Sequence, residues 1–67
     1  MISRQEAVTL AKAAVVESGG IWQEPVVVRW GPVNYSIWTN AYAHGGNVSV
    51  RVNRRSGLAT VMGRTAK

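Results

Sequence analysis

Few residues of this 67-residue chain carry the functional groups that catalysis or metal binding requires. There is no cysteine and no aspartate, and the single histidine, His44, precedes two glycines in a predicted turn. The nearest glutamate, Glu24, is distant in the sequence. Nucleophilic catalysis and metal coordination both need several convergent groups, and one histidine supplies only one of them. We therefore expect no enzymatic activity, no metal ion and no cofactor.

Arginine is the residue type with a strong binding group that is common in this chain. Eight Lys and Arg residues against three glutamates give a net charge of +5, and the glutamates all fall within the first 24 residues. The remaining segment, 25–67, contains basic side chains and no acidic one: Arg29, Arg51, Arg54, Arg55, Arg64 and Lys67. Guanidinium groups bind phosphate and carboxylate in bidentate fashion, so such a surface attracts polyanions. Net charge also keeps a small protein in solution, so the charge alone names no partner.

The element that begins the chain is a helix, predicted over about 3–18. Ser3 and Glu6 match a capping box, in which each side chain accepts a hydrogen bond from the other residue's amide. Apolar residues follow at helical spacing: Ala7, Leu10, Ala11 and Ala14. Gly19 and Gly20 then end the helix in the usual way. The small residues on this apolar face allow the helix to lie close to a sheet.

β-Branched and aromatic residues dominate the rest of the chain and predict strands. The predicted ranges are about 25–30, 35–42, 48–53 and 58–62. Short links between them favour antiparallel neighbours. We therefore predict a single small α+β domain over residues 1–67, with one N-terminal helix packed on a three- or four-stranded antiparallel meander sheet. The valines of 48–52 would face the helix.

Aromatic residues lie on the same predicted strands as the arginines. Alternation puts Trp38 and Tyr42 on the face of strand 35–42 opposite Ile37. If Ile37 faces the helix, Trp38 and Tyr42 lie on the open face of the sheet near Arg51. Exposed Trp, Tyr and Arg side chains form protein hot spots and also stack on nucleic-acid bases. The predicted partner-binding residues, on this face and on the 53–57 hairpin, are Arg51, Arg54, Arg55, Trp38, Tyr42 and Arg64.

Two segments resemble the PepSY domain family. The opening Ile2-Ser3-Arg4-Gln5-Glu6-Ala7-Val8-x-x-Ala11 is similar to that family's capped first helix. Residues 48–58 resemble its last hairpin, where a strand runs into an Asp-x-x-Thr-Gly turn. Asn53 stands at the Asp position and Ser56 at the Thr position, and both keep a side-chain acceptor for the turn. The resemblance implies a helix followed by a meander, and a role as an inhibitory pro-segment or a cell-envelope binding module without catalytic residues.

These features favour a binding protein over an enzyme. The leading hypothesis is a protein-interaction or inhibitory module that binds an acidic protein through its basic sheet face and hairpin. One alternative is a small nucleic-acid-binding protein that uses the same face, and another is a self-associating structural module or a pro-segment fragment.

The sequence also bears on assembly and location. We expect a monomer or a weak homodimer. We also expect no membrane span, because no apolar run approaches the ~20 residues of a spanning helix. The location would be cytoplasmic if the chain is complete, and envelope or secreted if it is an excised or processed PepSY-like segment.

Overall fold

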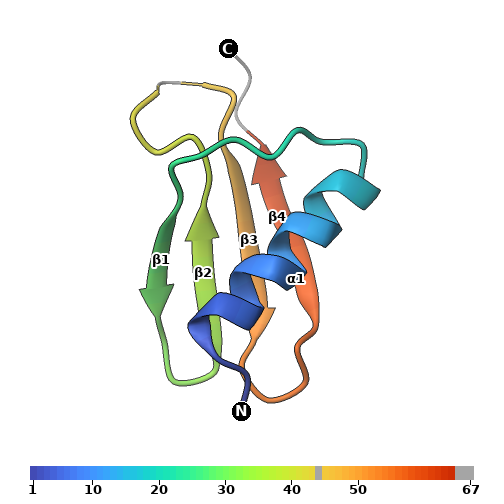
Figure 1. Ribbon diagram of the computed structural model, residues 1–67, viewed down its shortest axis with the longest axis vertical. Helices are drawn as coiled ribbons and strands as arrows, with labels where there is room; N and C mark the ends of the chain where they lie inside the picture. Colours follow the sequence, from blue (N-terminus) through green and yellow to red (C-terminus); the bar gives the residue numbers. More distant parts are fainter. Residues whose placement is uncertain (44, 65–67) are drawn as a thin grey trace.

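The computed structural model describes residues 1–43 and 45–64, and it consists of one helix followed by a four-stranded sheet (Figure 1). The helix is α1 (Arg4–Glu17), and the strands are β1 (Val27–Trp30), β2 (Asn34–Trp38), β3 (Val48–Asn53) and β4 (Ala59–Arg64). Each strand pairs antiparallel with the next, in the order β1-β2-β3-β4. The predicted α+β class, with an N-terminal helix and an antiparallel meander, is confirmed.

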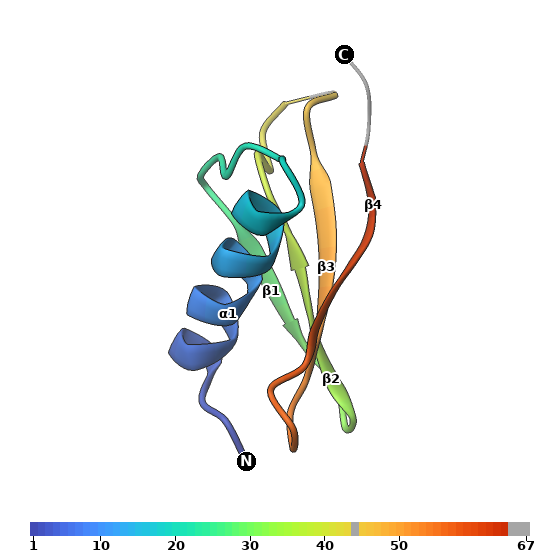
Figure 2. The ribbon, with the colours of Figure 1, turned by 90° about the vertical axis from the view of Figure 1, so that its right-hand side faces the viewer.

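The helix covers one face of the sheet and leaves the other bare. Figure 2 shows the two layers from the side, with α1 lying along one face of the strands. The helix packs mainly on β4, β3 and β2. β1 is the strand at one end of the sheet order, and in Figure 1 it lies to the side of the helix and is not covered by it.

The core lies between the helix and the sheet. Ala7, Ala11 and Val15 recur every four residues and are the buried residues of α1. Leu10, which the sequence placed in this stripe, is instead exposed at its margin, close to Gly57. The sheet contributes the buried residues Tyr35, Ile37, Val48, Val50 and Val52. The two alanines allow the close approach that the sequence predicted, and the valines of β3 face the helix as expected.

Several strand boundaries differ from the prediction, and for two of them, the start of β1 and the end of β2, the structure shows the reason. β1 starts at Val27 because Pro25 has no N–H for the ladder, and its carbonyl accepts a hydrogen bond from Ala41 N at 3.0 Å. β2 ends at Trp38 because Asn40 adopts a left-handed conformation, with φ of 50°. The prediction of a strand over 35–42 was therefore too long. The last strand, β4, starts one residue later than the predicted range 58–62 and continues past its predicted end to Arg64.

Two buried polar side chains hold the link between β2 and β3. Asn47 Nδ2 donates to the carbonyls of Thr39 (2.9 Å) and Asn40 (2.8 Å), and Asn47 Oδ1 accepts from Gly45 N (3.0 Å). Thr39 Oγ1 accepts from Val48 N at 2.9 Å. Since Thr39 and Asn47 are both buried, these bonds satisfy groups that water cannot reach. The described residues of the link, 39–43 and 45–47, thus do not continue β2.

Candidate functional site

The candidate site is the face of the sheet that points away from α1. Directly opposed residues of an antiparallel sheet share a face, and alternation separates them from buried Ile37 and Val50. One row across the four strands holds Arg29, Ser36, Arg51 and Thr60. The neighbouring row holds Val27, Trp38, Ser49 and Gly63. We call these eight residues, together with Met62 at the β4 bulge, the open face.

Two arginines make the open face electropositive. Arg29 and Arg51 flank Ser36 on either side, two strands apart, which corresponds to roughly 10 Å between their Cα atoms. Both are exposed. None of the three glutamates belongs to the sheet, because Glu6 and Glu17 are on α1 and Glu24 is in the α1–β1 link. The positive charge therefore has no counter-charge on this face.

Apolar side chains lie beside the two arginines. Trp38 is 39% exposed and Met62 is 51% exposed, and Val27 is exposed as well. Val27, Arg29 and Trp38 line a shallow depression of about 380 Å³. Further along this row, Gly63 adds no side chain to the surface. A Cβ placed on it would meet nothing within 4 Å, so the space above it is open. The open face thus combines an aromatic ring, aliphatic groups and guanidinium groups, which is the composition of protein interaction hot spots.

The structure brings two of the six predicted site residues together on the open face. These are Arg51 and Trp38, on neighbouring strands. Tyr42 is 90% exposed but lies in the β2–β3 link, beyond the end of β2. Arg55 is exposed in the β3–β4 turn. Arg64 is the last residue of β4, and its side chain lies outside what the structure describes.

The remaining predicted residue, Arg54, is folded back onto the helix side of the sheet. Its guanidinium carbon lies 4.6 Å from the ring centre of Trp30 and 5.5 Å from that of Tyr35. Its Nη1 donates to the carbonyls of Gly31 (3.0 Å) and Pro32 (3.3 Å). Arg54 therefore joins the β3–β4 turn to the β1–β2 turn, and it is not the exposed anchor that the sequence suggested.

Seven of the nine open-face residues were missing from the predicted site, and three of these seven add charge or apolar surface: Arg29, Val27 and Met62. The sequence identified Arg29 only as one of the basic residues of segment 25–67. It assigned neither Val27 nor Met62 to a binding surface. Alternation within strand 25–30 could have placed Val27 and Arg29 on one face. Their position beside Trp38 depends on the register between β1 and β2, which the sequence does not show.

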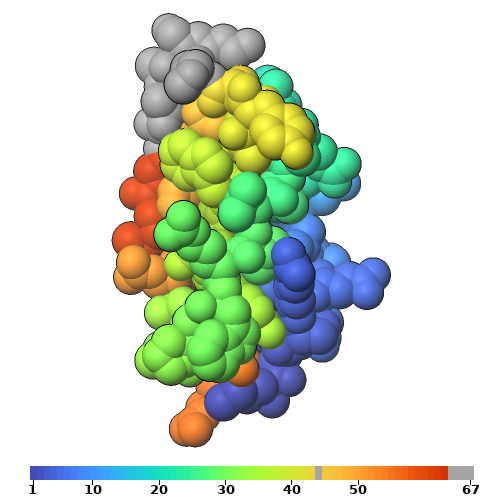
Figure 3. All heavy atoms as spheres, turned by 90° about the vertical axis from the view of Figure 1, so that its left-hand side faces the viewer, coloured from blue at the N-terminus to red at the C-terminus, as the bar shows by residue number. Residues whose placement is uncertain are grey.

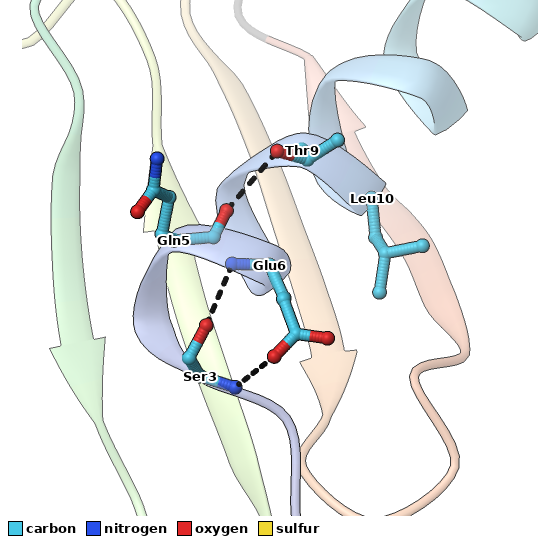
Figure 4. A pocket seen from close by; sticks show the side chains of 5 residues that line it. All are labelled: Ser3, Gln5, Glu6, Thr9 and Leu10. Atoms are coloured by element: carbon cyan, nitrogen blue, oxygen red, sulfur yellow. Dashed lines mark hydrogen bonds between the residues drawn. The ribbon is translucent and has the colours of Figure 1, made fainter.

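A hollow of about 410 Å³ at the start of α1 serves a different purpose (Figure 4). Ser3 N donates to Glu6 Oε1 at 3.0 Å, and Glu6 N donates to Ser3 Oγ at 3.1 Å, which confirms the predicted capping box. Thr9 Oγ1 donates to Gln5 O at 3.2 Å. The pKa of the Glu6 carboxyl is held below its ordinary value. The Ser3 amide has the larger effect and the Ser3 hydroxyl the smaller one. These polar atoms are paired with one another, so they stabilise the helix end and we assign no ligand to them.

The chain was also compared with known proteins. No family model, no curated protein and no solved structure matched it. The resemblance to the PepSY family therefore stays a prediction.

The residues that the structure describes, 1–43 and 45–64, do not include His44. In that part of the chain, no three or more His, Cys, Asp or Glu side chains cluster as a metal site would require. Nor does it contain a helix with the length and apolarity needed to cross a bilayer.

Proposed function

We propose that this chain is a non-enzymatic protein-interaction module, acting as an inhibitor or adaptor, whose open face binds an acidic protein surface. The observation that carries the proposal is the Arg29–Ser36–Arg51 row beside the apolar row of Val27 and Trp38. Carboxylates of a partner would pair with the guanidinium groups, and an apolar side chain would fill the depression against Trp38.

The open face suits a protein better than a nucleic acid. Proteins that bind single strands stack successive bases on several aromatic side chains. The open face has one aromatic ring, Trp38, because Trp30 and Tyr35 are on the helix side and Tyr42 is in a link. Aliphatic Val27 lies directly opposite Trp38 instead, and such a pair matches the apolar side chains of a protein. Binding of nucleic acid by the same arginines is the alternative that the experiment must exclude.

The test compares two variants with the same change of net charge. Arg29→Glu with Arg51→Glu reverses the charge of the open face, and Lys12→Glu with Arg55→Glu reverses two exposed cations elsewhere. Immobilised wild type and the Lys12/Arg55 variant should retain the same acidic protein from nuclease-treated extract of the native host. The open-face variant should lose it. Equal retention by all three proteins would contradict the proposal.

The nucleic-acid alternative has its own measurement. Wild type is titrated with a single-stranded thymidine oligonucleotide at low salt and then at increasing salt. We expect no saturable binding. Tight binding that weakens log-linearly with salt, by roughly one counterion per phosphate contact, would replace the proposed function with nucleic-acid binding.

A further inference from the structure

β1 forms a free edge of the sheet that can accept another strand. It is the first strand in the sheet order, and Figure 3 shows β1, in green, at the surface between α1 and the far strands. The opposite edge differs because the β3–β4 register shifts at Ser49/Val50 and α1 packs over β4. Bulges twist an edge away from a new partner. β1 pairs with β2 in unbroken register, so it is the regular edge of the two.

The backbone groups of Val28 and Trp30 point to this edge. Thr39, which directly follows β2, donates its N–H to Val48 O at 3.0 Å, so the odd-numbered residues of β2 in phase with it turn their backbone groups toward β3. The even-numbered residues then face β1, where the register pairs them with residues 27 and 29. The N–H and C=O groups of Val28 and Trp30 consequently point away from β2. Each of these two residues offers one donor and one acceptor to an incoming strand.

The two sides of β1 have different chemistry. On the helix side, Val28, Trp30 and Tyr35 line a groove of about 240 Å³ with Arg4, and Trp30 is 67% exposed. On the open face, Arg29 presents its guanidinium group beside the depression at Trp38. An added strand would therefore meet a groove lined by Val28, two aromatic rings and Arg4 on one side, and the exposed Arg29 on the other.

We propose that the β1 edge binds an extended acidic segment of a partner protein as a fifth, antiparallel strand, an inference that rests on the proposed function. The residue opposite Arg29 would be acidic, and the residues opposite Val28 and Trp30 would be apolar and enter the groove. Charge selects this occupant over a second copy of the chain. A second copy carries the same +5 charge and would bring its own Arg29 to the shared edge.

The probe is a synthetic peptide of roughly seven residues that alternates valine and glutamate, with both ends blocked. In the proposed register the valines exchange hydrogen bonds with Val28 and Trp30, and the glutamate opposite Arg29 turns its backbone away from β1. N-methylation of the valine amides should weaken binding at least tenfold, because it removes donors to β1. N-methylation of the glutamate amides should leave the affinity within about twofold. Any other pattern, measured by calorimetry, overturns the proposed strand pairing.

A pair of variants tests the groove. Trp30→Ala should weaken binding of the unmodified peptide about tenfold, whereas Tyr42→Ala, which removes an exposed aromatic ring in the β2–β3 link, should not. Since the Trp30 ring also contacts Arg54, a thermal melt must show that Trp30→Ala remains folded. Equal affinity of the two folded variants would overturn the proposal.

The outcomes separate this proposal from the proposed function. If the peptide does not bind while the Arg29/Arg51 variant still loses its captured protein, the edge proposal fails and the open-face proposal stands. If wild type captures no protein and binds no peptide, both fail. Sedimentation of the wild type completes the test, and a dimer that Trp30→Ala dissociates would also overturn the edge proposal, because a second copy would then occupy the edge.

Discussion

At the scale of single residues, adjacent arginines have different surroundings. Arg55 is exposed in the turn, and its amide, with that of Ser56, donates to Asn53 Oδ1 at 2.9 Å. The Arg54 guanidinium instead lies against two aromatic rings and donates to two carbonyls. Its Nε is buried and has no hydrogen-bond partner among residues 1–43 and 45–64, which offsets part of this stabilisation.

Arg54 should therefore contribute to stability while Arg55 does not. We expect Arg54→Ala to lower the free energy of unfolding by about 1–2 kcal/mol, because cation–π contacts and charged hydrogen bonds are lost. Arg55→Ala should change it by less than about 0.5 kcal/mol, as for an ordinary surface site. Urea unfolding measures both values. Equal effects of the two substitutions would show that the Arg54 contacts contribute nothing in solution.

The capping box should make helix stability depend on pH. The pKa of Glu6 lies below its ordinary value of 4.5, mainly because the Ser3 amide donates to its carboxylate. The carboxylate is thus stabilised in the folded state, so its contribution is complete above the ordinary pKa and is lost as the pH falls through the lower, folded value. Glu6→Gln should reduce the loss of melting temperature between neutral and acid pH. Glu17→Gln is the matched control, and an unchanged pH profile in Glu6→Gln would contradict the assignment.

At the scale of elements, local signals placed the helix correctly and placed the strand ends less well. The helix is bounded by Ser3 and Ser18, and its capping groups are all within a few residues of one another. Strand ends depend on groups that come from elsewhere. Asn40 N donates to Gln23 O, and Ala41 N donates to Pro25 O, so the chain after Thr39 pairs with the α1–β1 link and leaves β3.

The β2–β3 link depends on Asn47 in a way that can be measured. Asn47→Ala should lower the free energy of unfolding by about 2 kcal/mol, because it leaves the buried Thr39 carbonyl without its donor. Asn47→Asp should also destabilise the protein, since a carboxylate cannot donate to the Thr39 and Asn40 carbonyls. Ser49→Ala, on the open face nearby, serves as the control. A melting temperature for Asn47→Ala equal to that of Ser49→Ala would refute this role.

At the scale of the whole molecule, charge is divided between layers. The sheet carries arginines and no glutamate, whereas α1 and its following link carry all three acidic residues. This separation leaves the open face positive, while the residues that the sheet adds to the core, beside those of α1, come from the other face of the same strands. Binding and stability therefore depend on different side chains of the sheet.

That division predicts that the open face can be changed without unfolding the protein. Arg29→Glu with Arg51→Glu lowers the net charge from +5 to +1, because each substitution removes two units (5 − 4 = 1). Both side chains are exposed, so the melting temperature should stay within a few degrees of wild type. Circular dichroism melts check this. Unfolding of the double variant at room temperature would mean that the arginines stabilise the fold itself.

The amino-acid sequence by itself determined the elements and their order. The signals that predict them are local in the sequence: the helix caps, the spacing of the alanines and the alternation of the valines. The confinement of the glutamates to the first 24 residues can also be read directly from the sequence. Only the tertiary structure decided which arginines share a surface. Strand register placed Arg29 beside Ser36 and Arg51, and side-chain packing turned Arg54 toward Trp30. Register and packing depend on residues far apart in the chain, and spacing along one segment does not contain that information.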